Sequence, residues 1–275
     1  MHYSFKAIPG FVAALLLLSC NDGTDKHNQG ITPSVAPIPT INYAVVKPFP
    51  HDITYFTEGL LVYNGQLFES TGSPDDLPYT RSLVGSLDTV TGKMNIKVEL
   101  DRKKYFGEGI VILNNKLYQL TYKNRTCFVY DAQTFKRIGQ FSYSNPEGWG
   151  LTTNGTEIIM SDGTDKLTFL HPDQFTPVKQ LAVTENGSPR NYLNELEYIG
   201  GFIYANIWLR DEIVKIDPAN GKIVGRLDLS SLAREAKARQ AEAGALNGIA
   251  WDAVTDKIYV TGKLWANLYQ INFPH

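Results

Sequence analysis

One acidic residue of the chain stands in a setting that suits acid–base chemistry. Glu108 lies between two glycines in the segment 105–110, Tyr-Phe-Gly-Glu-Gly-Ile. Glycines allow backbone and ligand to approach closely, and burial raises the pKa of a carboxyl group so that it can take up and release a proton near neutral pH. The same glutamate would suit a structural role, as a buried carboxylate that accepts hydrogen bonds from backbone amides. The residues by themselves leave both roles open.

Near-copies of this segment recur along the chain, at residues 55–60, 146–151, 192–197 and 245–250. Aligned with Glu108, they place four residues at the repeat position: Glu58, Trp149, Glu195 and Gly248. A period of about 40–50 residues made of short strands is typical of a β-propeller, with one blade for each repeat. Five copies predict five blades.

Short apolar runs separated by turn residues follow the copies. Residues 61–68 and 111–118 each hold two such runs, around Asn64-Gly65 and Asn114-Asn115. Runs around turns of this kind indicate strand, hairpin and strand, and the chain then continues into a third run and a last, more polar strand. We therefore expect an all-β fold of four-stranded antiparallel blades, without the long helices of an α/β fold.

The two ends of the repeat region are expected to meet in one blade. After residue 246 the last repeat holds only three strands, whereas residues 41–48 alternate like a strand ahead of the first copy. We expect the 41–48 strand to be the outer strand of the last blade, so that the ring closes and an edge is covered. A helix over 230–244, with a serine cap and a terminal glycine, is expected as an insertion before that blade. It is a surface insertion or, alternatively, a lid at the mouth of the ring.

The first residues have the composition of an export signal. Residues 1–19 combine a basic residue, an apolar core and a serine before Cys20, and the core is too short for a stable membrane-spanning helix. The Leu-Leu-Ser-Cys ending resembles a bacterial lipobox, which predicts a lipoprotein signal peptide over 1–19 and a lipid on Cys20. A plain secretory signal is the alternative.

The segment after Cys20 is expected to be a tether. Residues 20–40 are rich in Gly, Asn, Pro, Ser and Thr and predict a flexible linker. The propeller is then expected over 41–275, lipid-anchored at the bacterial cell envelope as a periplasmic or outer-membrane lipoprotein.

The composition excludes several classes of protein. The chain is 43% hydrophobic and 20% charged, with a net charge of −2 at pH 7, and it shows no basic footprint for nucleic acid. The histidines are scattered without the spacing of a zinc site, and neither a Walker loop nor a Gly-x-Ser-x-Gly elbow is present. We expect no cofactor, no metal and no nucleic-acid partner, with membrane contact only through the lipid on Cys20.

The repeat motifs carry a specific resemblance. They include Phe-Thr-Glu-Gly-Leu at 56–60, Tyr-Phe-Gly-Glu-Gly at 105–109, Gly-Trp-Gly-Leu at 148–151, Ser-Asp-Gly-Thr at 161–164, Leu-Asn-Glu-Leu-Glu-Tyr at 193–198, Ala-Asn-Ile-Trp at 205–208 and Val-Thr-Gly-Lys-Leu-Trp at 260–265. In this order they resemble the plant and bacterial type of glutaminyl-peptide cyclotransferase, the glutaminyl cyclase family of papaya latex. The similarity covers essentially all of residues 41–273. It implies a five-bladed propeller that needs no metal.

The resemblance also implies a reaction, the cyclisation of an N-terminal glutamine to pyroglutamate with loss of ammonia. The partners implied are peptides or proteins that begin with Gln. The neutral α-amine must attack the γ-amide carbon, and the leaving nitrogen must be protonated. One carboxyl group that takes the first proton and gives it to the leaving nitrogen serves both steps. Glu108 matches the family's catalytic glutamate in Phe-Gly-Glu-Gly.

Eight further residues match the family's substrate pocket: Phe56, Glu58, Phe106, Tyr122, Trp149, Asn194, Trp208 and Lys263. An indole offers a flat apolar wall and one N–H donor, and Asn offers both donors and an acceptor to an amide. Lys263 is expected to stabilise developing negative charge or to hold Glu108 in place. For the tryptophans the alternative role is packing within blades.

Two of these positions depart from the papaya-type pattern, which has Gln in place of Glu58 and Trp in place of Tyr122. A second carboxylate near Glu108 is expected to raise the pKa of Glu108 or to help anchor the substrate's α-ammonium. Tyrosine keeps an aromatic wall, so we expect altered affinity rather than lost chemistry.

Two other functions remain open at this point, because a propeller fold alone does not settle chemistry. The main alternative is a non-catalytic propeller lipoprotein that binds a ligand or peptide at its axis. A minor one is a lactonase-type hydrolase with a metal on the axis, held by Glu58, Glu108 and Glu195. Since a closed ring has no exposed edge to pair, we expect a monomer.

Overall fold

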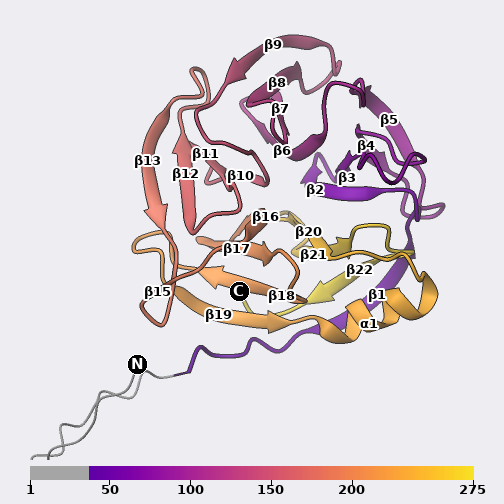
Figure 1. Cartoon of the computed structure of the whole chain (residues 1–275). Helices are drawn as coiled ribbons and strands as arrows, with labels where there is room; N and C mark the ends of the chain where they lie inside the picture. The colour runs from indigo at the N-terminus through magenta and orange to yellow at the C-terminus, as the bar shows by residue number, and fades with distance from the viewer. Residues whose placement is uncertain (1–36) are drawn as a thin grey trace, which may run out of the picture. The chain divides into compact units, whose positions relative to one another are not determined.

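Five antiparallel sheets of four strands form a ring in the computed structural model of the chain, which describes residues 37–275 (Figure 1). The predicted all-β, five-bladed propeller of four-stranded blades is confirmed. The signal peptide over 1–19, the lipid on Cys20 and most of the 20–40 tether lie outside the described residues.

The first four blades use strands in chain order. Blade one holds β2 (Phe56–Tyr63), β3 (Gln66–Gly72), β4 (Leu83–Leu87) and β5 (Met94–Glu99). Blade two holds β6 (Gly107–Leu113), β7 (Lys116–Thr121), β8 (Thr126–Asp131) and β9 (Arg137–Ser142). Blade three holds β10 (Leu151–Thr153), β11 (Ile158–Met160), β12 (Lys166–Leu170) and β13 (Pro177–Ala182). Blade four holds β16 (Leu193–Ile199), β17 (Phe202–Ile207), β18 (Glu212–Ile216) and β19 (Ile223–Asp228), after a small hairpin of β14 (Thr184–Glu185) and β15 (Ser188–Pro189).

The fifth blade joins the two ends of the described chain. Its strands are β20 (Leu246–Asp252), β21 (Lys257–Gly262), β22 (Asn267–Asn272) and, on the outside, β1 (Ala44–Pro50). β1 pairs antiparallel with β22, so that residue 44 lies opposite residue 272. The predicted ring closure is confirmed, although the strand starts at residue 44 rather than 41. The outer edge also accommodates the prolines of β1, which have no N–H to give to a ladder.

The boundary between tether and propeller differs from the prediction. Ile38 packs against the core between blades three and four, and the N–H of Ile41 donates to the carbonyl of Arg226 at 2.7 Å. The N–H of Arg226 in turn donates to the carbonyl of Pro39 at 3.0 Å. Residues 38–40 therefore lie along β19 instead of belonging to a free linker.

The cores lie between neighbouring blades, where the faces of adjacent sheets pack on each other. The helix α1 (Ser230–Arg239) adds Leu232, Ala233 and Ala236 to the core between blades four and five. It is shorter than the predicted 230–244, because the chain turns extended at Gln240 instead of ending at a glycine. The predicted serine cap is also wrong: the carboxylate of Asp228 accepts the N–H of Ser230 at 2.9 Å.

A β-bulge interrupts the innermost strand of four blades near its start. The strand register shifts between Thr57 and Gly59, Gly107 and Ile110, Leu193 and Leu196, and Leu246 and Ile249. A bulge bends the strand and re-aims a side chain, which is why the polar residue of each repeat leaves the ordinary in–out alternation.

These bulges correct the alignment of the repeats by one residue. Asn194 and Asn247 are the counterparts of Glu108, and Glu195 takes the place of Gly109. Glycine is needed at that place in blade two, because a Cβ on Gly109 would lie 2.6 Å from the backbone nitrogen of Leu151 in the next blade.

Candidate active site

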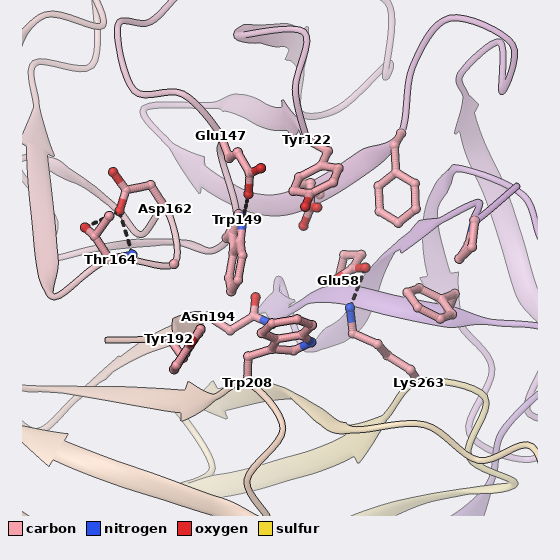
Figure 2. A pocket seen from close by; sticks show the side chains of 15 residues that line it. Glu58, Tyr122, Glu147, Trp149, Asp162, Thr164, Tyr192, Asn194, Trp208 and Lys263 are labelled. Atoms are coloured by element: carbon pink, nitrogen blue, oxygen red, sulfur yellow. Dashed lines mark hydrogen bonds and ion pairs between the residues drawn. The ribbon is translucent and has the colours of Figure 1, made fainter. Parts of the chain in front are cut away.

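A cavity of about 480 Å³ opens at the bulged ends of the innermost strands (Figure 2). Glu108 and the eight residues predicted to bind substrate all line it: Phe56, Glu58, Phe106, Tyr122, Trp149, Asn194, Trp208 and Lys263. The structure thus brings together residues that lie far apart in the chain, from Phe56 to Lys263. A cavity of this size with a few convergent polar groups is typical of a small-ligand site.

Glu58 and Lys263 form a buried ion pair inside the cavity (Figure 2). The ammonium nitrogen of Lys263 lies 2.5 Å from one carboxylate oxygen of Glu58, and the side-chain amide of Asn247 donates to the other at 3.2 Å. The Lys263 ammonium also lies 4.4 Å from the centre of the Phe56 ring. Lys263 therefore holds Glu58, whereas one expectation was that it would hold Glu108.

The backbone fixes the position of Lys263 on both sides. The N–H of Gly244 donates to the carbonyl of Lys263 at 2.7 Å, and the N–H of Lys263 donates to the carbonyl of Ala245 at 3.0 Å. Leu264, which follows, has a φ of +61°, a conformation that a non-glycine residue keeps only when its surroundings determine it. The segment after α1 thus positions a cavity residue, but no residue of 230–244 lines the cavity. The alternative of a lid at this segment is therefore not supported.

Both carboxyl groups are buried, and Glu108 is the one without a cation bonded to it among the described residues. Its side chain is almost fully buried, and burial together with the neighbouring Glu58 carboxylate raises the pKa of Glu108 well above its ordinary value, against an opposing effect of Lys263. Burial also raises the pKa of Glu58, but its ion pair with Lys263 counteracts this. The arrangement favours an ionised Glu58 beside a protonated Glu108. Carboxyl groups whose environments separate their protonation states are typical of acid–base pairs.

Aromatic rings wall the cavity on two sides. Trp149 and Trp208 meet edge to face, with ring centres 5.6 Å apart, and Tyr192 lies 5.8 Å from Trp208. The indole N–H of Trp149 donates to the carboxylate of Glu147 at 2.9 Å. Of the two indoles, Trp208 is therefore the one whose N–H is free of a bond to the described residues. On the other side the Phe106 and Tyr122 rings lie tilted to each other at 54°, with ring centres 5.8 Å apart.

Asn194 presents an unused acceptor. Its side chain is buried, and its amide oxygen has no hydrogen-bond partner within residues 37–275. Its backbone is fixed, because the Ser161 hydroxyl donates to the Asn194 carbonyl at 2.6 Å and accepts the N–H of Gly150 at 2.7 Å. A buried polar atom without a partner is costly, so this oxygen is placed to accept a hydrogen bond from a ligand.

The cavity includes residues that sequence reasoning did not assign: Pro74, Glu147, Asp162, Gly163, Thr164 and Tyr192. Most of them stand inside motifs that had been recognised, at 146–151, 161–164 and 192–197, so the signal was present. Gly163 is required there, because a Cβ would lie 2.6 Å from the ring of Trp149 and its φ is +79°. Asn247, which bonds Glu58, was missed because the repeats were aligned one residue off.

Glu195 lies apart from this cavity. Its two carboxyl oxygens accept the backbone N–H of Leu60 at 3.2 Å and of Ile249 at 2.8 Å, which ties blade four to blades one and five. Glu58, Glu108 and Glu195 therefore do not converge on one point. Within residues 37–275, no group of three or more His, Cys, Asp or Glu side chains has the arrangement of a metal site. The donor set of the lactonase-type alternative is not assembled.

Fold and cavity together define a class: a five-bladed propeller whose mouth holds a buried carboxyl pair, a lysine and an aromatic cage. The family model for glutamine cyclotransferase matches residues 12–273. The glutaminyl-peptide cyclotransferase of Arabidopsis thaliana is 41% identical over 229 residues, which cover 82% of this chain and 70% of that protein. The crystal structure of the glutaminyl cyclase of Myxococcus xanthus matches with a TM-score of 0.78 and 34% identity, over 86% of this chain and 98% of that one. The chain belongs to the glutamine cyclotransferase family, as its motifs predicted.

Proposed function

We propose that this chain is a glutaminyl-peptide cyclotransferase, which converts the N-terminal glutamine of peptides or proteins to pyroglutamate and releases ammonia. The observation that carries the proposal is the Glu108 carboxyl, buried in a cavity with its pKa raised well above the ordinary value. Such a group can both donate and accept a proton at the pH where an α-amine, with a pKa of about 8, is partly neutral.

The proton balance of the reaction fits one carboxyl group. The neutral α-amine attacks the γ-carbon, a C–N bond forms, and the carbonyl oxygen takes the negative charge. Protonated Glu108 gives its proton to the amide nitrogen, whose bond to carbon then breaks so that ammonia leaves. The carboxylate takes up the proton that the attacking nitrogen must lose. Glu108 ends the cycle protonated, as it began.

The other cavity groups orient the substrate amide in this mechanism. The free amide oxygen of Asn194 accepts an N–H of the substrate, and the indole N–H of Trp208 donates to its γ-carbonyl oxygen. Trp149 supplies a flat wall, because its own N–H is bonded to Glu147. The Glu58–Lys263 pair keeps the Glu58 carboxylate beside Glu108. This negative charge raises the pKa of Glu108, so that Glu108 starts the reaction protonated.

The test is ammonia release from Gln-Ala amide by the purified protein, with pyroglutamate detected by mass spectrometry. Asn-Ala amide and Glu-Ala amide are the matched controls, and each assay is run with and without a chelator. We expect turnover of the glutamine peptide alone, unchanged by the chelator. A folded protein that releases no ammonia from any Gln-peptide would leave only the binding-propeller alternative. Loss of activity on chelation would contradict a metal-independent reaction.

We also propose that the protein acts as a lipid-anchored monomer of the bacterial cell envelope. Support comes from the lipobox-like ending at Cys20, the linker composition that follows it, and the closure of the ring by β1. Within residues 37–275, no helix is long and apolar enough to cross a membrane. Labelled fatty acid should be incorporated in a bacterial host by the wild type and not by Cys20→Ala. Light scattering should give a monomer mass; a dimer would contradict the monomer.

A further inference from the structure

A second hollow adjoins the active-site cavity on the side of blades one and two. It has a volume of about 470 Å³ and is formed by residues 73–75, 102–106 and 122–124. Three of its residues, Pro74, Phe106 and Tyr122, also line the active-site cavity. The two hollows therefore meet at the Phe106 and Tyr122 rings.

The wall of this groove is held by Arg102. One guanidinium nitrogen donates to the carbonyls of Pro78 at 2.7 Å and Thr80 at 3.2 Å, and the other donates to the carbonyl of Pro74 at 2.9 Å. These bonds fix the 74–80 loop, so the groove has a defined shape. Because its donors are used in this way, Arg102 is a structural cation of the groove.

Three exposed lysines make the groove cationic. Lys103, Lys104 and Lys123 line it, against the single carboxylate of Asp75 among its lining residues. Lys104 lies 3.8 Å from Asp101 and Lys123 lies 3.7 Å from Glu147, with both lysine side chains more than 60% exposed. Contacts that long and that exposed compensate little of the charge. Lys103 has no ion pair among the described residues.

The chemistry of the reaction requires an exit for the substrate chain. Only the first residue is cyclised, and the rest of the peptide stays attached to its α-carbonyl and must leave the cavity. An opening that shares wall residues with the cavity is the natural path. The cavity itself is lined by acidic groups such as Glu147 and Asp162, whereas this opening is cationic.

We propose that this groove binds the residues that directly follow the N-terminal glutamine and favours Asp and Glu side chains there. The inference rests on the proposed cyclotransferase function and names the substrate class of that site. Carboxylates that follow the glutamine meet Lys103 and Lys104, and the gain is electrostatic, so it weakens as salt screens exposed charges.

The experiment compares kcat/KM for three C-terminally amidated peptides, Gln-Asp-Asp, Gln-Ala-Ala and Gln-Lys-Lys, at low and high salt. In the wild type the acidic peptide should exceed the basic one by about three- to twentyfold at low salt, as a few exposed ion pairs allow. The ratio should approach one at high salt. The double variant Lys103→Glu/Lys104→Glu should abolish or invert the preference.

A control with the same change in net charge separates local from overall electrostatics. Lys136 and Lys257 are exposed and line neither hollow, so Lys136→Glu/Lys257→Glu should keep the wild-type ratio. Urea unfolding of both double variants establishes that they are folded. Binding to vesicles of anionic lipid is measured for each protein as well.

The outcomes are distinct. Turnover of Gln-Ala-Ala amide with equal rates for the acidic and basic peptides overturns the inference and leaves the proposed function standing. A ratio that both double variants change equally also overturns it. If Lys103→Glu/Lys104→Glu loses only vesicle binding and keeps the peptide ratio, the lysines face a membrane surface instead and the inference is wrong. No turnover of any of the three peptides overturns the proposed function, and the inference with it.

Discussion

Two pairs of glutamates on innermost strands, three of them buried and Glu197 partly buried, differ in the groups that their carboxyl oxygens contact. Glu58 and Glu108 face a cavity, whereas Glu195 and Glu197 accept backbone N–H groups, Glu197 that of Trp251 at 2.8 Å. Burial raises the pKa of all four carboxyl groups. A raised pKa is thus common to the catalytic candidates and to the residues that join blades. Access to a cavity is the feature that distinguishes them.

The largest expected effect is on turnover in the cavity pair. Glu108→Gln keeps the shape and removes the proton carrier, so kcat should fall by about 10²–10⁴-fold, the range for loss of a general acid–base group. The free energy of unfolding, measured with urea, should be unchanged or slightly higher, since the substitution removes no charge from an ion pair. The rate is measured as ammonia release at saturating Gln-Ala amide. A kcat near the wild-type value would remove Glu108 from the mechanism.

The matched substitution in the joining pair, Glu195→Gln, should lower stability and leave kcat unchanged, the reverse of Glu108→Gln. Glu195→Gln places an amide N–H₂ against the N–H of either Leu60 or Ile249 and leaves a buried donor unsatisfied. The free energy of unfolding should fall by about 1–3 kcal/mol, while kcat stays near the wild-type value. Denaturant midpoints and initial rates of the same preparation check both. A large loss of kcat with unchanged stability would contradict the structural role of Glu195.

Glu197 of the joining pair should contribute to the pH dependence of stability. Burial raises the pKa of Glu197 from 4.5 to about 8, so the folded state binds a proton between these values that the unfolded state has released. The contribution of Glu197 to the free energy of unfolding is therefore fully present below pH 4.5 and is lost as the pH rises toward about 8. In Glu197→Gln the free energy of unfolding should fall less steeply with pH, because up to one proton fewer is released on unfolding. Urea midpoints from pH 5 to 8 measure the slope, and an equal slope in both proteins would contradict the assignment.

A smaller effect is expected when the cavity pair loses its anion. Glu58→Gln removes a negative charge beside Glu108 and leaves the Lys263 ammonium unpaired, and both changes lower the pKa of Glu108. The limb of the kcat/KM profile that belongs to the enzyme should move to lower pH, while the substrate's limb stays. The profile is recorded with Gln-Ala amide for both proteins. A shift to higher pH would mean that Glu58 does not raise the pKa of Glu108.

The smallest effect is expected at the aromatic wall. Tyr122→Trp restores the residue of the papaya-type pattern and changes only the size and polarity of a surface that contacts Phe106. KM should change by less than about tenfold, which corresponds to about 1.4 kcal/mol, with kcat retained. Phe in place of Tyr122 is the control for loss of the hydroxyl alone. A collapse of kcat in both Tyr122→Trp and Tyr122→Phe would give the hydroxyl a part in the chemistry.

The repeated local pattern predicts the number of blades, whereas the cavity residues were predicted from the motifs shared with the glutaminyl cyclase family, and all nine line the cavity. Asn-Gly and Gly-Gly turns and apolar runs mark the hairpins, and the repeat motif marks the mouth. The alignment failed by one residue at Asn194 and Glu195, where an acidic residue stands next to the true counterpart of Glu108. Only the strand register reveals that both residues lie in a bulge and that Asn194 is the one equivalent to Glu108. The Asn247 bond to Glu58 and the end of α1 at Arg239 depend on contacts between distant segments and carry no local signal.

The closure of the ring has a consequence for the order in which the chain is made. β1 pairs with β22, and residue 44 lies opposite residue 272. Nearly the whole chain must therefore be synthesised before the last blade is complete. Contacts of such long range are slow to form. In the meantime β1 is an unpaired strand with free backbone groups. Its sequence limits the hazard: Lys47, Pro48 and Pro50 lie within it, and lysine and proline are residues that hinder pairing with a foreign edge. A chain that stopped before residue 267 would leave that strand without its partner.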